Sequence, residues 1–185
     1  MKRFLLMGVV ALLLAVIPVT ASTFLALSQD ELIAQSDAIV QGRVLKVSSF
    51  WDKTGRVIQS EALVRVEDTV KGTAPSVVVV RTFGGTVGSF TVEAHGFPKF
   101  AANDHVLLFL QNANETAEVT AYRQGQYRIV RDKSGVEIAV PTVEGGSLIS
   151  RDGRAIPAAK AVRLDTFKNV IRTAVEKPVV GRPAN

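Results

Sequence analysis

Two long stretches of strand-like sequence joined by a short turn constrain the fold of this chain more than any other feature. Residues 37–47 are rich in β-branched side chains, and residues 57–71 alternate apolar and polar side chains over most of their length. Both patterns are typical of β-strands. Residues 52–56 read Asp-Lys-Thr-Gly-Arg, which predicts a turn, so the two strands pair as a hairpin. Gly42 and a loss of alternation near Leu45 indicate a bulge or sharp coil in the first strand.

Shorter strand patterns follow this hairpin. They cover residues 77–80, 90–94, 106–110, 118–123, 126–131 and 136–140. The runs 77–80 and 106–110 are continuously apolar, which predicts strands covered on both faces. Many short strands with frequent turns are typical of an all-β sandwich or barrel, and two long leading strands favour the barrel. The predicted fold is therefore mainly β, a small closed or partly open antiparallel barrel similar to the oligonucleotide- and oligosaccharide-binding (OB) fold.

In the sequence, one helix is expected before the strands and one after them. Ser28 and Glu31 have the spacing of a capping box, which predicts a short N-terminal helix over residues 29–35. A C-terminal amphipathic helix is expected over about residues 165–176, because its apolar residues recur with helical spacing. This apolar stripe consists of Phe167, Val170, Ile171, Ala174 and Val175.

The N-terminus has the pattern of a secretory signal peptide. Lys2 and Arg3 precede an unbroken apolar stretch over residues 4–17, which is too short to span a membrane. We predict cleavage between Ala21 and Ser22, so the protein is exported and meets the membrane only through the signal peptide before cleavage. The alternative is an uncleaved anchor, which is disfavoured because no charged residue follows immediately to stop transfer.

The signal peptide and a change of sequence pattern after Pro141 divide the chain into three segments. Residues 1–21 are the signal peptide, 22–142 the β-barrel domain, and 143–185 a loop, the C-terminal helix and a flexible tail. The last segment is basic, and Lys168 and Arg172, which face away from the apolar stripe, form a candidate basic surface for an anionic surface or an acidic partner. An ordinary solvated helix face is the alternative. The formal net charge of +5 is too small to indicate nucleic-acid binding.

The chain offers little material for catalysis. It contains no cysteine, which excludes disulfides, thiolate metal sites and a cysteine nucleophile. His95 and His105 are its two histidines, and with Glu93 and Asp104 nearby they suggest a hydrolytic or metal site. Their spacing is not that of a helical metal motif. We therefore predict surface histidines, and assign no catalytic residue, metal ligand or cofactor.

The turn of the leading hairpin carries the best candidate for binding. Phe50 and Trp51 sit beside Lys53 and Arg56 at the hairpin tip. An exposed tryptophan at a loop tip can anchor a partner. The alternative is that Trp51 folds back over the end of the barrel.

Four motifs taken in order resemble those of a group of uncharacterised exported bacterial proteins. They are Ser36–Val44, Val64–Gly72, Gly84–Gly85 and Val106–Leu110, and the resemblance covers about residues 28–176. It implies a bacterial source and a periplasmic or secreted location.

The strand order is also similar to the netrin-like barrel of tissue inhibitors of metalloproteinases. Those inhibitors bind the protease zinc through an N-terminal cysteine, so their mechanism does not carry over to a chain without cysteine.

These observations predict an exported, non-enzymatic β-barrel protein that binds a macromolecular partner in the envelope or medium, with a secreted protease as one candidate. The first alternative is an envelope hydrolase or metal-dependent enzyme that uses His95 or His105. The second is a glycan-binding module, which would need an exposed platform of aromatic side chains.

Overall fold

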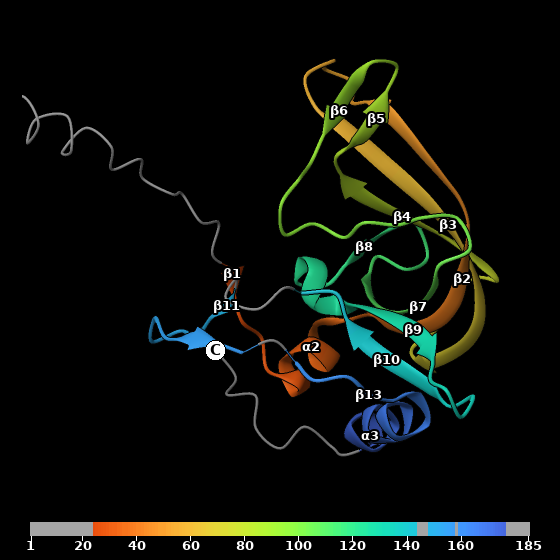
Figure 1. Ribbon diagram of the computed structural model, residues 1–185, viewed down its shortest axis with the longest axis vertical. Coiled ribbons are helices and arrows are strands. Elements are labelled where there is room, and N and C mark those ends of the chain that lie inside the picture. Colours follow the sequence, from red (N-terminus) through yellow and green to blue (C-terminus); the bar gives the residue numbers. More distant parts are fainter. Residues whose placement is uncertain (1–23, 144–147, 158, 177–185) are drawn as a thin grey trace, which may run out of the picture.

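The computed structural model describes residues 24–143, 148–157 and 159–176 (Figure 1). The predicted signal peptide, its cleavage site between Ala21 and Ser22, and the predicted C-terminal tail lie outside the described residues. In the part of the chain that is described, no helix has the length and apolar character needed to cross a membrane.

The structure is mainly β, with two α-helices that pack on one side of the sheet and one short 3-10 helix. The helices are α2 (Gln29–Gln35), the 3-10 helix η1 (Tyr122–Gly125) and α3 (Leu164–Glu176). The strands are β1 (Phe24–Leu25), β2 (Ala38–Trp51), β3 (Ile58–Lys71), β4 (Val77–Phe83), β5 (Gly85–Val87), β6 (Phe90–Val92), β7 (His105–Gln111), β8 (Thr116–Val119), β9 (Gln126–Arg131), β10 (Glu137–Pro141), β11 (Leu148–Ile149), β12 (Ala155–Ile156) and β13 (Val162–Arg163).

Both predicted α-helices are confirmed. In α2 the Ser28 side chain accepts from the Glu31 backbone and the Glu31 carboxylate accepts from the Ser28 backbone, so the predicted capping box is present. Helix α3 begins one residue before the expected Asp165. Its residues Leu164, Phe167 and Ile171 are buried, as expected for an amphipathic helix that packs on a sheet.

The main sheet has eight strands in the order β13-β10-β9-β7-β2-β3-β4-β8, and β8 also pairs with β7. The second pairing of β8 partly closes a ring of five strands, through Leu110↔Val119 and Gln111↔Glu118. The predicted mainly β architecture is confirmed, but the predicted closed or partly open antiparallel barrel is wrong: the sheet is mixed, and its partly closed ring is not a barrel. The physical reason for the mixture is that five strands cannot alternate direction around a ring, so one pair, β4 and β8, runs parallel.

Strand β2 is coiled, as the sequence predicted. Its register against β3 shifts between Gln41 and Gly42 and again between Val44 and Lys46. A Cβ at Gly42 would overlap the carbonyl oxygen of Arg65, so this crossing requires glycine. The coiling lets β2 pair with β3 along nearly its whole length while its first residues, Ala38–Arg43, pair with β7.

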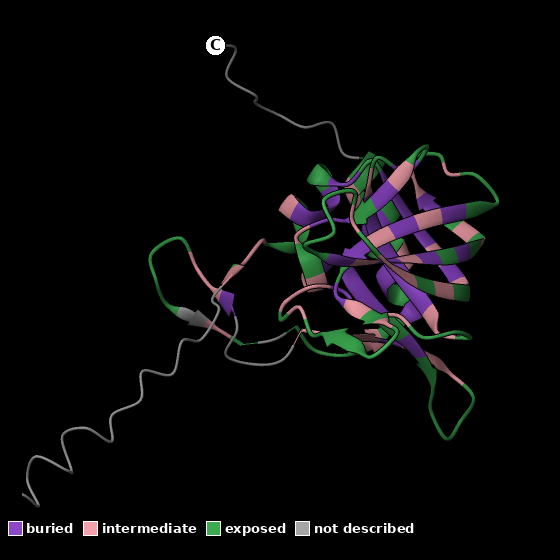
Figure 2. Ribbon diagram, turned by 90° about the horizontal axis from the view of Figure 1, so that it is seen from above, coloured by how far each residue is buried: buried purple, intermediate pink, exposed green. Residues whose placement is uncertain are grey.

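Two cores lie on the two sides of the sheet. Figure 2 shows buried residues alternating with more accessible ones along the strands of the sheet. The first core fills the ring and consists of Ala38, Val40, Val44, Ala62, Val64, Val78, Val80, Val106, Leu108, Leu110, Ala113, Ala117 and Val119. The second lies between the sheet and the helices and consists of Leu32, Ile33, Ile39, Val70, Leu107, Phe109, Tyr127, Ile129, Ala139, Leu164, Phe167 and Ile171. Strand β7 contributes alternately to both cores, which confirms that it is buried on both faces.

The prediction that the apolar run 77–80 forms a strand buried on both faces is wrong for β4. Its side chains alternate between buried and accessible, and Val77 is 41% exposed and Phe83 43% exposed. The buried face of β4 lines the ring, whereas the residues of its outer face are only partly buried or exposed. An apolar run does not by itself reveal whether a second layer is present.

Two of the motifs singled out in the sequence, Ser36–Val44 and Val64–Gly72, meet at one structural junction. The Lys71 ammonium donates to the carbonyl oxygens of Ile33 (2.5 Å) and Ser36 (2.7 Å) at the C-terminal end of α2. Its desolvation lowers the pKa of Lys71, and the nearby Asp37 carboxylate opposes this shift. Gly72 has φ +70°, and a Cβ there would overlap the Asp37 carbonyl. The end of β3 is therefore held against the connection between α2 and β2 by these hydrogen bonds and by the close contact at Gly72.

Replacing Lys71 should weaken this junction. Lys71→Met keeps the aliphatic stem but leaves the carbonyls of Ile33 and Ser36 without their donor. We expect the free energy of unfolding, measured by urea denaturation, to fall by about 1–3 kcal/mol. Lys53→Met, in the exposed turn, is the matched control and should change it by less than about 0.5 kcal/mol. Equal stability of the Lys71→Met variant and the wild type would contradict the proposed role of the ammonium.

Candidate functional site

The β2–β3 hairpin ends in a turn organised by Asp52. Its Oδ1 accepts from the backbone N–H groups of Arg56 (2.9 Å) and Val57 (3.0 Å), and its Oδ2 accepts from Thr54 Oγ1 (2.7 Å). The hydrogen bond from Thr54 is the largest cause of the lowered pKa of Asp52, followed by those from Val57 and Arg56. Gly55 takes φ +67° to complete the turn. The tip is therefore a defined turn that holds its exposed neighbours in place.

The four residues predicted at the tip do not form one cluster. Phe50 and Trp51 are neighbours in a strand, so they point to opposite faces. The Arg81 guanidinium lies 6.0 Å from the centre of the Phe50 ring on the outer face. On the other face, Trp51 meets Phe90 edge-on at 5.8 Å between ring centroids.

The second face is the more accessible one. Trp51 is 38% exposed and Phe90, on β6, is 62% exposed. Lys53 and Arg56 are exposed in the turn and form no ion pair with any of the described residues. We call Trp51, Lys53, Arg56 and Phe90 the hairpin tip. It combines two aromatic side chains with two unpaired positive charges.

One edge of β2 is open beside the hairpin tip. Asp52 N donates to Val57 O (2.8 Å), so these two residues form a hydrogen-bonded pair of the hairpin. Hydrogen-bonded and non-hydrogen-bonded pairs alternate along an antiparallel ladder. The backbone groups of Val47, Ser49 and Trp51 therefore point away from β3. Among residues 24–143, 148–157 and 159–176, no strand pairs with β2 on that side beyond Arg43.

A cavity of about 250 Å³ lies next to this open edge. Val47 and Ser49 line it, together with the β5–β6 hairpin that crosses the upper part of β2 and β3 (Figure 1). Ser49 Oγ lies 2.8 Å from Ser60 Oγ, which donates to Gly84 O (2.7 Å). A Cβ at Gly85 would overlap both serine hydroxyls, which explains the glycine pair found in the sequence.

A second cavity, of about 210 Å³, is one that sequence reasoning missed. We call it the aromatic cleft. It is lined by Gln59, Arg81, Thr82, Phe83, Phe97, Pro98, Glu118, Val119 and Tyr122. The Phe97 ring meets Phe83 at 4.9 Å and Tyr122 at 4.9 Å, both edge-on. Phe83 and Tyr122 are 43% and 45% exposed, so aromatic surface reaches solvent at this cleft.

The position of Tyr122 depends on an unusual backbone. Ala121 and Tyr122 both have positive φ, +52° and +59°, which is unfavourable for residues other than glycine. This reversal ends β8 at Val119, so the strand predicted over 118–123 is shorter and is followed by η1. The amino-acid sequence carries no glycine or asparagine at these two positions that would signal the reversal.

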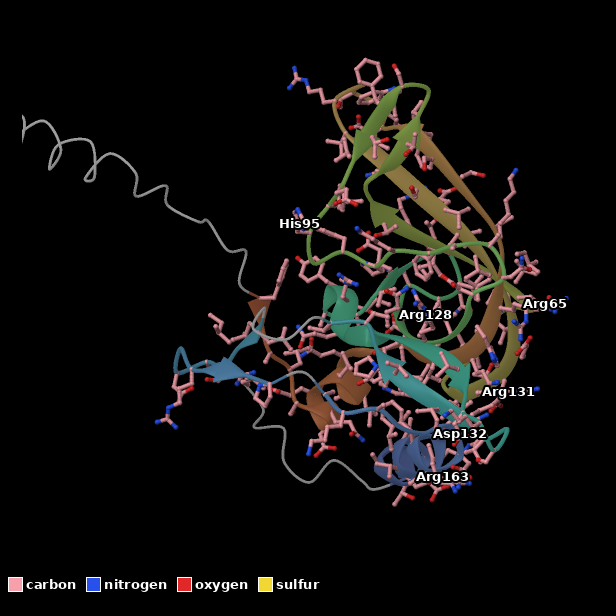
Figure 3. All side chains as sticks on the ribbon, viewed as in Figure 1. Arg65, His95, Arg128, Arg131, Asp132 and Arg163 are labelled. Atoms are coloured by element: carbon pink, nitrogen blue, oxygen red, sulfur yellow. The ribbon has the colours of Figure 1, made fainter. Side chains whose placement is uncertain are left out.

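The two histidines are not brought together. His95 is exposed in the loop after β6, where Glu93 pairs with Lys99 at 3.0 Å instead of with a histidine (Figure 3). His105 lies at the start of β7, where its Nδ1 is 3.9 Å from Glu137 Oε1, the oxygen that also pairs with Arg131. Within the described residues, no three histidine, cysteine, aspartate or glutamate side chains come together in a way that could hold a metal ion.

His105 has alternative partners for its two protonation states. Its Nε2 lies 3.0 Å from both Gln41 Nε2 and Glu67 Oε2. It can accept from the amide in the neutral tautomer that carries its proton on Nδ1, and it donates to the carboxylate when the ring is protonated. Glu137 lies on the other side of the ring, and Arg43 is nearby. Burial is the largest influence and lowers the pKa of His105, while Glu67 opposes it.

The candidate basic surface on α3 is engaged by the sheet. Lys168 and Arg172 both pair with Asp68 on β3, the second at 3.1 Å, and Lys168 also donates to Gln41 Oε1 (2.8 Å). Burial of Asp68 opposes ionisation, but the two cations outweigh it and lower the pKa of this carboxyl. The charges that face away from the apolar stripe therefore help to attach α3.

Comparisons with protein-family models, with curated proteins and with solved structures each returned no match. The resemblance to exported bacterial proteins and the OB-like or netrin-like fold therefore stay predictions from the sequence.

The environment of His105 makes stability depend on pH. An unfolded histidine binds a proton near pH 6.5, whereas folded His105 has a lowered pKa. The unfolded state therefore binds more protons as the pH falls through 6.5, and the free energy of unfolding falls with it. Urea denaturation of His105→Gln should show a smaller fall than the wild type.

His95→Gln is the matched control for this measurement, because it removes the exposed histidine and leaves the contacts of His105 in place. It should show the same fall as the wild type. If His105→Gln and the wild type lose stability in parallel as the pH falls, His105 is not the group responsible.

Proposed function

We propose that this chain is an exported, non-enzymatic protein that binds an extended segment of a partner protein. The segment adds as a strand to the open edge of β2, and its end packs against the hairpin tip. The observation that carries the proposal is the unpaired edge of β2 at Val47, Ser49 and Trp51, which lies beside the exposed Trp51–Phe90 pair. Strand addition uses such an edge, since backbone hydrogen bonds supply affinity and neighbouring pockets select side chains.

Charge near the edge indicates the kind of segment. Lys46, Lys53 and Arg56 lie along or beyond the open edge and form no ion pair with described residues, whereas Asp52 is held within the turn. An acidic segment complements this surface. The cavity beside Val47 and Ser49 can accept a small side chain that points from the added strand toward the ring. A secreted protease with an acidic extended segment is one candidate partner.

The architecture supports this proposal over an enzymatic role. A partly open ring of five strands is the form that OB folds take, and OB folds commonly serve as binding modules. His105, one of the two histidines available for the hydrolase hypothesis, is held by Glu67 and Gln41, and His95 lies elsewhere. The OB-like or netrin-like fold and export through the signal peptide are parts of the same proposal.

The test begins with affinity capture from periplasmic and secreted fractions of a bacterium that produces the protein, followed by binding measurements with the purified partner. Ser49→Pro removes an outward N–H at a strand edge, where proline is tolerated. We expect it to raise the Kd at least about tenfold, equivalent to the loss of about 1.4 kcal/mol of binding free energy. Trp51→Ala should have an effect of similar size.

Ser49→Ala is the matched control for the edge. It removes the same hydroxyl but keeps the backbone N–H, so the partner should bind with nearly unchanged Kd. Circular dichroism and thermal melting confirm that each variant is folded. Strand addition is wrong if Ser49→Pro is folded and binds like Ser49→Ala, and the protein-binding proposal is wrong if no partner is captured above an unrelated β-protein control.

A further inference from the structure

We infer that the aromatic cleft is a second binding site, and that it takes one neutral sugar ring of a glycan. Its side chains come from separate parts of the chain: Gln59 from β3, Phe83 from β4, Glu118 from β8, Tyr122 from η1 and Phe97 from the loop before β7. The site therefore exists only in the folded protein. It uses none of the residues of the hairpin tip or of the open edge of β2.

The aromatic side chains supply apolar surface for the ring. Phe83 and Tyr122 flank Phe97 and touch it edge-on, so Phe97 supports both while they remain 43% and 45% exposed. The C–H groups of a pyranose are apolar on each face of the ring and pack well against aromatic faces. The cleft therefore has the aromatic platform that a glycan site requires.

The polar side chains supply hydrogen bonds for hydroxyl groups. Gln59 lies opposite Phe83 in the β3–β4 ladder, and Glu118 lies opposite Arg81 in the β4–β8 ladder. The side chains of Gln59 and Glu118 form no hydrogen bond or ion pair with another described residue. An amide donates and accepts, and a carboxylate accepts from two hydroxyls, which suits vicinal hydroxyl groups.

Charge and size favour a neutral sugar. The Arg81 guanidinium is held by the Glu61 carboxylate at 2.6 Å, which leaves Glu118 as the unpaired charge in the cleft. An unpaired carboxylate disfavours phosphate and sulfate groups. The volume of about 210 Å³ is smaller than the roughly 300–1,000 Å³ of typical drug-sized sites. It suits a single six-membered ring at an open surface.

The backbone at Ala121 and Tyr122 supports a functional role for this cleft. Two consecutive non-glycine residues lie in the left-handed region, although this conformation is unfavourable for each. Their consequence is that Tyr122 projects against Phe97 and also contacts Phe24 at 5.3 Å. The ring is thus held in place before a ligand arrives, which reduces the ordering needed on binding.

The test uses the full mature chain and a set of named probes. Saturation-transfer NMR and calorimetry are carried out with neutral tetrasaccharides of β-1,4-glucose, β-1,3-glucose, α-1,4-glucose and β-1,4-N-acetylglucosamine, and with a sulfated oligosaccharide. We expect millimolar or tighter binding of at least one neutral probe and weaker binding of the sulfated one. Absence of binding for every neutral probe, or tighter binding of the sulfated probe, would overturn the inference.

Variants locate the bound sugar. Tyr122→Ala and Phe83→Ala should each raise the Kd about tenfold, and Glu118→Gln, which keeps the shape of the side chain, should raise it several-fold. Phe90→Ala is the matched control, because it removes an exposed aromatic ring at the hairpin tip. Sugar binding that survives all three cleft variants in folded protein, or is lost equally in Phe90→Ala, would place the ligand elsewhere and overturn the inference.

Discussion

The coiling of β2 is the constraint on which the rest of the structure depends. Because the strand bulges at Gly42 and again near Leu45, it can pair with β7 through its first residues and continue along β3 to the hairpin tip. Without these bulges the side chains of β2 would not alternate correctly between the core inside the ring and the core beneath the helices. One strand therefore joins the two layers and also sets the direction of the hairpin.

The two candidate binding sites arise where the ring stops. Strand β7 pairs with β2 only as far as Arg43, so the upper edge of β2 is left open. Strand β8 pairs with β4 only through Val79–Arg81, so Phe83 extends beyond it and meets Phe97, which in turn meets Tyr122. Partial closure thus has two different consequences. On one side it exposes backbone groups, and on the other it exposes aromatic side chains.

The motifs that carry the family resemblance have structural roles in this fold. Ser36 Oγ donates to Leu32 O (2.8 Å) and meets Thr120 Oγ1 (2.9 Å), and Asp37 Oδ2 accepts from Asn112 N (2.7 Å). Lys71 and Gly72 complete the same junction from the end of β3. These residues fasten α2 to the start of the ring. They lie apart from the residues proposed to bind partners, whereas the Gly84–Gly85 motif lines the cavity beside the open edge of β2.

Local sequence was enough to decide the capping of α2, the amphipathic face of α3, the β2–β3 hairpin and the burial of β7 on both faces. Each follows from contacts between residues close in the chain or from a simple alternation of side chains. Tertiary structure decided the parallel pair β4–β8, the exposed face of β4, the pairing of Lys168 with Asp68 and the convergence of Phe83, Phe97 and Tyr122. These features depend on contacts between segments that are far apart in the sequence, and local sequence patterns do not reveal which of those segments meet.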